Sequence, residues 1–300
     1  MSVLPAISPI SRPETAGVPY ITTTEFTNAP TGIQTGNITA GELAALILRA
    51  SSWLDLEAHQ VLAATTDTEF CQIRVHRDGT FSVFPRCYPV RAVTSVSVGP
   101  YPGDLTALTS LSTVAVQNRR FKVYQGSLPS VTWKGPIQFG PSWSDTDLWC
   151  QYTYVNGYPV STLQSTANTG VNSLTVVNGT GILPGMTLTI TDDPNTETVT
   201  VASSYTFGSA TVPLVSNTLN THAAGVPVTA MPPGLKQIAI LATAGFIVER
   251  GTDALVMASL DGGPSRQQTG GGTGNDFLQQ ARQMLNEAGF VAKVSVQGDL

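Results

Sequence analysis

The stretch from Thr39 to Leu62, TAGELAALILRASSWLDLEAHQVL, constrains the fold more than any other part of the chain. Its apolar side chains recur at steps of three and four residues, which is the period of an amphipathic helix with a broad buried face. They are Leu43, Leu46, Ile47, Ala50, Trp53, Leu54, Ala58, Val61 and Leu62. Thr39 and Glu42 have capping-box spacing, which marks the start of the helix. The stretch predicts a single helix of about 23 residues, roughly 35 Å long.

The residues before this helix, 1–38, predict an extended arm. Prolines block helix formation at intervals along it: Pro5, Pro9, Pro13, Pro19 and Pro30. The exception is the segment from Val18 to Phe26, which could form a short strand or pack against the helix.

After the helix the apolar period changes from 3.6 to 2, so strands are expected. Residues 69–98 are expected to form one sheet, with a tight hairpin turn at Arg77-Asp78-Gly79-Thr80 because Asp-Gly tolerates positive φ. A second hairpin is expected within 113–124, about Gln117-Asn118. Strands at 131–133 and 148–155 then close the sheet.

Residues 161–230 read as a separate module. Asp192, Asp193 and Glu197 are its only ionised side chains. Short alternating runs separated by turn residues predict strands at 173–177, 186–190, 197–201, 210–214 and 226–229. Five short strands in such a segment predict a small all-β barrel or sandwich, inserted at a surface loop of the main domain.

Helices are predicted again after the module. Pro232-Pro233 pre-sets the first turn of one, and Gly251 is expected to end it. Residues 261–274 predict a Gly-rich linker, followed by a C-terminal helix and tail over 275–300. The order of helices and strands predicts an α+β fold class, with a main part in 39–160 and 231–260, plus the inserted module.

Composition and charge limit the functions open to this chain. Charged residues make up 12% of it, about half the usual share of ~25%, which suits a surface covered by neighbours or a Thr-rich β protein of ordinary solubility. The net charge of −5 argues against holding nucleic acid through Lys and Arg. The three cysteines have no CxxC or metal spacing, which favours buried thiols in a reduced compartment. Neither a signal peptide nor a membrane-spanning run is recognised.

No catalytic, cofactor or metal constellation is found, so the chain is not expected to be an enzyme. His59, His76 and His222 share no ligand spacing with Cys, Asp or Glu. His222 is the most interesting of the three because it lies in a loop, yet no partner is visible for it. The aromatic group around Trp133, Trp143, Trp149, Tyr152, Tyr154 and Tyr158 could be a sugar-binding platform, although alternating aromatic residues in strands are more often core.

The first hundred residues resemble the head-to-tail connector (adaptor) proteins of long-tailed phages that infect actinobacteria. The resemblance lies in short phrases, which are Tyr20-Ile21-Thr22, Ala29-Pro30-Thr31-Gly32-Ile33, Arg49-Ala50-Ser51-Ser52-Trp53-Leu54-Asp55, the run from Gln60 to Glu69, and His76-Arg77-Asp78-Gly79-Thr80. The late helices match loosely. The module, with Leu183-Pro184-Gly185-Met186, is similar to small β modules of phage structural proteins.

This resemblance implies a virion structural protein of the neck, assembled in the host cytoplasm. It also implies a core that is a small helical bundle with a β-sheet element, here residues 39–160 and 231–260. Family members form a ring, typically a dodecamer, that docks under the portal protein and carries the stopper. DNA passes through the ring without sequence-specific binding, and no membrane is involved. The alternatives are a phage tail or capsid decoration protein, and a carbohydrate-binding β protein.

Two sets of candidate contact residues follow. The polar face of the first long helix, with Arg49, Asp55 and Glu57, is the candidate contact with a neighbouring subunit. The C-terminal helix is expected to dock on the portal through Phe277, Met284, Leu285 and Phe290. Deletion from Gly262 onward is then expected to leave a folded, soluble protein that no longer binds the portal.

Overall fold

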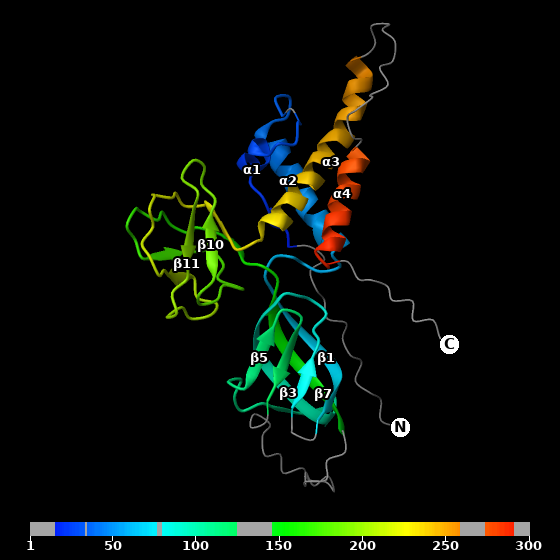
Figure 1. Ribbon diagram of the computed structural model, residues 1–300, viewed down its shortest axis with the longest axis vertical. Helices are drawn as coiled ribbons and strands as arrows, with labels where there is room; N and C mark the ends of the chain where they lie inside the picture. The colour runs from blue at the N-terminus through cyan, green and yellow to red at the C-terminus, as the bar shows by residue number, and fades with distance from the viewer. Residues whose placement is uncertain (1–15, 34, 77–79, 125–145, 259–273, 291–300) are drawn as a thin grey trace, which may run out of the picture.

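The computed structural model describes residues 16–33, 35–76, 80–124, 146–258 and 274–290. These residues form a helical bundle, a β region and a β module, which Figure 1 shows as three adjacent bodies. Each of the three has its own hydrophobic core. The coarse α+β prediction is therefore confirmed.

The bundle contains the helix predicted from the first long apolar stretch. Helix α2 spans Ala40–Glu57, and the capping box of Thr39 and Glu42 is present. The predicted extension to Leu62 is wrong, because the chain turns at His59, whose φ is +53°. Ala58, Val61 and Leu62 are nevertheless buried, so the apolar pattern marks the core correctly although the helix has ended.

The predicted extended arm is replaced, where the structure describes it, by a segment packed on α2. A short helix, α1, spans Thr23–Asn28 and begins with a capping box formed by Thr22 and Glu25. The prolines do not prevent it because it fits between Pro19 and Pro30. Tyr20, Ile21 and Phe26 are buried in the bundle core. Residues 1–15 lie outside the described part.

Two late helices complete the bundle. Helix α3 spans Pro233–Ala258 and so passes through Gly251, where it was expected to end. A glycine inside a helix costs only about 1 kcal/mol, so Gly251 does not have to end it. Helix α4 spans Gly274–Glu287 and is followed by Gly289 at φ +81°. Most of the predicted linker, 259–273, and the tail after residue 290 lie outside the described residues.

The β region is built on two antiparallel sheets. The first has the order β1-β7-β3-β4 and the second the order β2-β6-β5. Their bounds are β1 Thr65–Val75, β2 Phe81–Val83, β3 Val90–Tyr101, β4 Asp104–Ala107, β5 Val114–Gln117, β6 Arg120–Val123 and β7 Thr146–Asn156. The predicted single sheet over 69–98 is wrong, because β2 pairs with β6 instead. The predicted hairpin within 113–124 is confirmed as β5 and β6. The turn at 77–79 and the strand at 131–133 lie outside the described residues.

The β module contains all five predicted strands, with shorter bounds, and one that was missed. The strands are β8 Val160–Thr162, β9 Ser173–Thr175, β10 Thr187–Ile190, β11 Glu197–Thr200, β12 Thr211–Pro213 and β13 Pro227–Thr229. Their sheet orders are β11-β10-β13-β8 and β12-β9. The described residues of the module form no closed barrel.

In the β region and in the β module, the first strand pairs with the last, so the two ends of each unit lie side by side in space. In the β region Thr65 pairs with Asn156, and in the module Val160 pairs with Thr229. An isolated parallel β-bridge between Ala63 and Tyr158 joins the segment before β1 to the segment between β7 and β8. The chain thus leaves the helical bundle after α2, forms the β region and then the β module, and returns to the bundle at α3 (Figure 1).

Candidate functional site

Asp55, predicted to face a neighbouring subunit, lies inside the bundle. It is 1% exposed. Its carboxylate accepts hydrogen bonds from the Tyr20 hydroxyl, from the Ala16 amide at 2.8 Å and from the Leu62 amide at 2.9 Å. Burial raises the pKa of Asp55, and burial next to this carboxyl also raises the pKa of Tyr20. The prediction that Asp55 lies on the outer face is wrong, because the segment before α1 covers it.

Arg49 and Glu57 remain nearer the surface but make contacts within the chain. The Arg49 guanidinium lies 4.5 Å from the centroid of the Phe246 ring on α3. Glu57 accepts from the guanidinium of Arg282 on α4, with 2.8 Å from Nε to Oε2. These side chains join α2 to the other helices, so the subunit contact predicted for them stays a prediction.

The predicted portal-docking residues are largely used by the bundle itself. Leu285 is 0% exposed and Phe290 7% exposed, while Phe277 and Met284 pack half-buried on the same core. The Phe290 ring stacks on Tyr88 of the β region, with 5.3 Å between centroids. Two of the four side chains therefore cannot reach a partner unless α4 leaves the bundle. Deletion from Gly262 onward would remove part of the core, so a fully folded product is no longer expected.

The outer face of α2 is uncharged along its centre, with the exposed Arg49 beside it. Its centre follows three- and four-residue steps opposite the buried face of the helix. We call these residues the outer strip: Gly41, Ala44, Ala45, Leu48, Ser52 and Leu56. All are exposed except Ser52, which is half-buried, and Leu56 is 52% exposed. This strip was missed because the buried Asp55 was counted as part of the same face.

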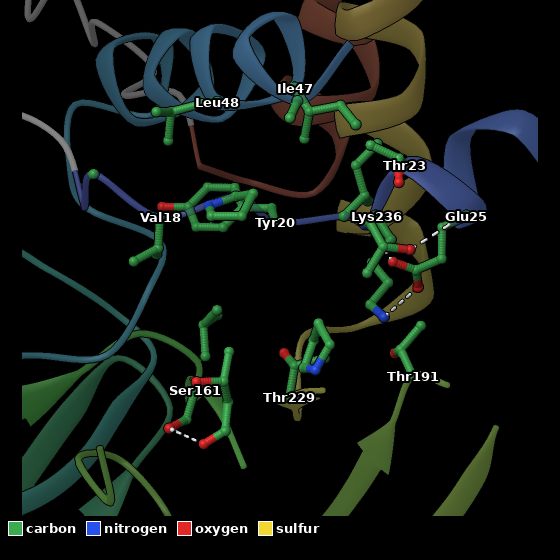
Figure 2. A pocket seen from close by; sticks show the side chains of 18 of the residues that line it. Val18, Tyr20, Thr23, Glu25, Ile47, Leu48, Ser161, Thr191, Thr229 and Lys236 are labelled. Atoms are coloured by element: carbon green, nitrogen blue, oxygen red, sulfur yellow. Dashed lines mark hydrogen bonds and ion pairs between the residues drawn. The ribbon is translucent and has the colours of Figure 1, made fainter. Parts of the chain in front are cut away.

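The outer strip continues into a cavity between the bundle and the β module (Figure 2). Its volume is about 700 Å³, and Val18, Tyr20, Ile47 and Leu48 form much of its bundle side. At one end Lys236 and Glu25 form an ion pair of 2.6 Å. The Thr191 hydroxyl on the module side is buried and has no hydrogen-bond partner. The lining is mainly apolar, as in sites that take an apolar group or a segment of chain.

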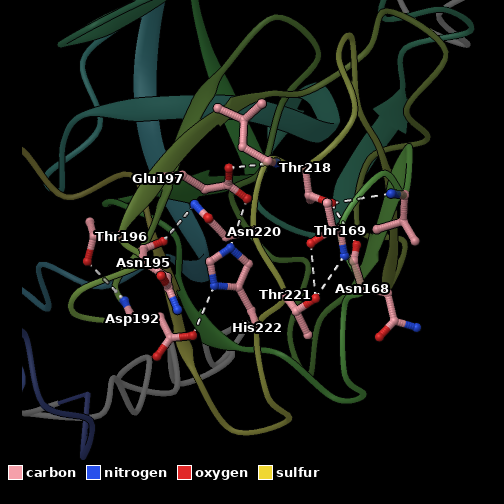
Figure 3. A network of polar contacts seen from close by, with 12 residues as sticks. Asn168, Thr169, Asp192, Asn195, Thr196, Glu197, Thr218, Asn220, Thr221 and His222 are labelled. Atoms are coloured by element: carbon pink, nitrogen blue, oxygen red, sulfur yellow. Dashed lines mark hydrogen bonds and ion pairs between the residues drawn. The ribbon is translucent and has the colours of Figure 1, made fainter.

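His222 has two partners that sequence reasoning did not find (Figure 3). Its ring is 0% exposed, with Nδ1 3.0 Å from Asp192 Oδ2 and Nε2 2.8 Å from Glu197 Oε1. Glu197 also accepts from the Leu219 amide at 2.8 Å. Two of the three acidic residues of the module are thus tied to one histidine. The cluster joins the β10–β11 loop to the loop before β13, and it leaves no ring nitrogen for a ligand.

The aromatic strand residues are mainly core. Tyr152 and Tyr154 are buried, and both hydroxyls donate to Glu69, at 2.6 and 2.7 Å. Burial, followed by the bond to Glu69, raises the pKa of both phenols. Trp149 and Tyr158 are half-buried, and Trp133 and Trp143 lie outside the described residues. The described part of this group offers no open aromatic platform.

Metal and membrane sites were also sought. Within the described residues no group of three His, Cys, Asp or Glu side chains is arranged to hold a metal ion. Among the helices that the structure describes, none is both long and apolar enough to cross a bilayer.

Comparisons with known proteins identified no relative of the chain. No known protein family matches it, and neither a curated protein nor a solved structure is significantly similar to it. Any function therefore has to be argued from its own residues.

Proposed function

We propose that the chain is a structural subunit of a phage head-to-tail connector, an adaptor ring that joins the portal to the stopper and tail. The ring, a dodecamer in the family that the sequence resembles, forms part of the DNA channel in the virion neck. It is assembled in the host cytoplasm and has no enzymatic role. The phrases shared with connector proteins around α2 support this proposal, as does the low content of charged residues.

The observation that carries the proposal is the outer strip of α2. An exposed apolar face at helical spacing, continuous with an apolar cavity, is typical of a protein–protein contact. We assign a second copy of this chain as its occupant, because a ring gives every copy the same neighbour on this side. The charged side chains that flank the strip, Arg49 and Glu42, contact α3 and leave the strip itself apolar.

The net charge of −5 fits the channel role. A surface with few cations gives DNA phosphates little to bind, so the genome can slide without sticking. Glu57 and Arg282 lie on the bundle surface and partly neutralise each other.

The experiment is negative-stain electron microscopy of the full chain mixed with portal rings of its own phage. The wild-type chain should form rings on the portal. The double variant Leu48→Glu and Leu56→Glu should remain folded by circular dichroism, because both side chains are exposed. Its self-association should weaken about tenfold or more, because two carboxylates are then desolvated at each contact.

The matched control is Leu219→Glu, which places the same charge on an exposed leucine of the β module. It should assemble as the wild type does. A trimer on the capsid would instead indicate a decoration protein, and tail binding would indicate a tail protein. Hits on a glycan array would favour a carbohydrate-binding protein. Unchanged assembly of the Leu48/Leu56 variant would show that the outer strip is not the subunit contact.

A further inference from the structure

Two of the three cysteines lie directly opposite each other on neighbouring strands. Cys71 of β1 pairs with Cys150 of β7 in the antiparallel register. Directly opposed residues in such a ladder have Cα atoms about 4.5 or 5.5 Å apart. Both values fall within the range of about 4.4–6.8 Å that a disulfide spans. The register therefore gives the two cysteines a Cα separation that a disulfide can span.

The two thiols also interact with each other. The Cys150 thiol donates to the Cys71 sulfur, and this bond lowers the pKa of Cys71 although burial opposes it. The same bond, together with burial, raises the pKa of Cys150. The pair thus has distinct members, because Cys71 more readily supplies a thiolate and Cys150 keeps its proton. Thiolates, not thiols, attack disulfides.

Access favours the same division of roles. Strand β1 lies at the edge of its sheet, and Cys71 is only half-buried there. Cys150 lies on β7, between β1 and β3, and is fully buried. Cys71 is therefore the more accessible of the two thiols. The third cysteine, Cys87, is buried, and its amide donates to the Tyr154 hydroxyl at 3.2 Å.

We propose that Cys71 and Cys150 are a disulfide-forming site, oxidised by a low-molecular-weight disulfide such as oxidised glutathione, that joins strand β1 to strand β7. The Cys71 thiolate attacks one sulfur of glutathione disulfide, and the sulfur–sulfur bond breaks to release one glutathione thiolate. The glutathione thiolate released first takes the proton of Cys150, and the Cys150 thiolate then attacks the Cys71 sulfur of the mixed disulfide. The second glutathione leaves as a thiolate and takes up from solvent the proton that Cys71 had given up. Two protein thiols are oxidised and one glutathione disulfide is reduced.

The bond would close a loop that contains β2 to β6 and the start of β7. A disulfide that closes a loop of this length lowers the conformational entropy of the unfolded chain. The oxidised β region should therefore be more stable than the reduced one. The site is independent of the connector function, since it depends only on the register of β1 and β7.

The test uses the full chain in reduced glutathione and in excess oxidised glutathione, quenched with iodoacetamide under denaturing conditions. Intact mass should show three alkylated cysteines in the reduced sample and one in the oxidised sample. The melting temperature should rise by about 10 °C on oxidation. Cys71→Ser and Cys150→Ser should each abolish both changes, and Cys87→Ser should keep them.

Several outcomes would overturn the proposal. Three alkylated cysteines after oxidation would do so, as would a stable glutathione adduct on Cys71 without an internal bond. Loss of the mass change in Cys87→Ser would assign the disulfide to another pair. If a serine variant fails to fold, the alkylation count of the wild-type chain still decides the question.

Discussion

The helical bundle and the β module both stabilise buried ionisable side chains, but the residues that surround them are separated by different distances along the sequence. Each buries ionisable side chains with several partners, such as Asp55 in the bundle and His222 in the module. The partners of Asp55 come from separate segments on both sides of α2, and the core around them includes helices more than 170 residues further on. Those of His222 lie within 30 residues along the chain.

This difference indicates which body can fold alone. The module takes its whole core from residues 163–228, so every contact is supplied by one continuous segment. The bundle needs α2, α3 and α4 together, and no continuous segment contains them without the β units. The module should therefore behave as an independent unit, and the bundle as the product of the whole chain.

The largest contrast should appear when the chain is cut into fragments. A fragment of residues 158–231 should fold and show cooperative thermal unfolding. A fragment of residues 16–62, with α1 and α2, should be largely unfolded, because short isolated helices are marginal in water. Circular dichroism and amide proton spectra measure both. An unfolded module fragment would contradict the comparison.

A core truncation in the bundle should come next. Leu285→Ala should destabilise the bundle by about 2–5 kcal/mol, because it leaves a cavity in a fully buried site. Hydrogen exchange read by mass spectrometry should show faster exchange in α2 and α3. Amides of the module should keep their rates.

The control for this variant is Leu219→Ala, at a leucine that is 77% exposed. It should change the stability by less than about 0.5 kcal/mol. Equal effects of the two substitutions would mean that α4 is not part of the bundle core.

The module offers the matching substitution. His222→Leu should destabilise it by about 1–3 kcal/mol, because Asp192 and Glu197 then lose their common partner. His76→Gln is the control, at an exposed histidine outside the module. Chemical denaturation of the isolated module and of the full chain should give the same loss. A loss seen only in the full chain would place the effect elsewhere.

The smallest effect concerns pH and the bundle. Hydrogen bonds from Arg250 and then from Thr39 lower the pKa of Glu42 from 4.5 to about 2. Because the folded value lies below the unfolded one, Glu42 stabilises the bundle above about pH 4.5, and this contribution is lost as the pH falls toward 2.

Glu42→Gln should therefore make the free energy of unfolding of the bundle depend slightly less on pH below about pH 4.5. The effect is small because the Arg250–Glu42 ion pair is exposed to solvent, which screens it. Glu287→Gln, on the outside of α4, is the matched control. Urea unfolding between pH 2 and pH 6 measures both. An unchanged acid limb in Glu42→Gln would show that this pair does not contribute.

Local signals in the sequence predicted local structure well. The capping box at Thr39 depends on residues three apart, and it placed the start of α2 correctly. The turn residues of the module marked its strands for the same reason. Where α2 ends could not be read, because the apolar pattern continues through Leu62 although the chain turns at His59.

The features that were missed depend on contacts between distant residues. Asp55 looks like a surface residue until the segment at Ala16 and Tyr20 is placed over it. His222 looked unpartnered because Asp192 and Glu197 lie 30 and 25 residues away from it in the sequence. Strand β2 was assigned to the wrong sheet because pairing with β6 is not encoded in its alternation. The outer strip of α2 was hidden by the error over Asp55.

The adjacent ends of the two β units have a consequence for the closure of the helical bundle. Joining α2 to α3 directly would require closing a loop of roughly 170 residues. Once Thr65 pairs with Asn156 and Val160 pairs with Thr229, only the short connectors 58–64, 157–159 and 230–232 separate the helices. The logarithmic dependence of loop entropy on length makes that closure easier by about 2 kcal/mol. The paired β units thus hold the end of α2 and the start of α3 close together in the folded chain.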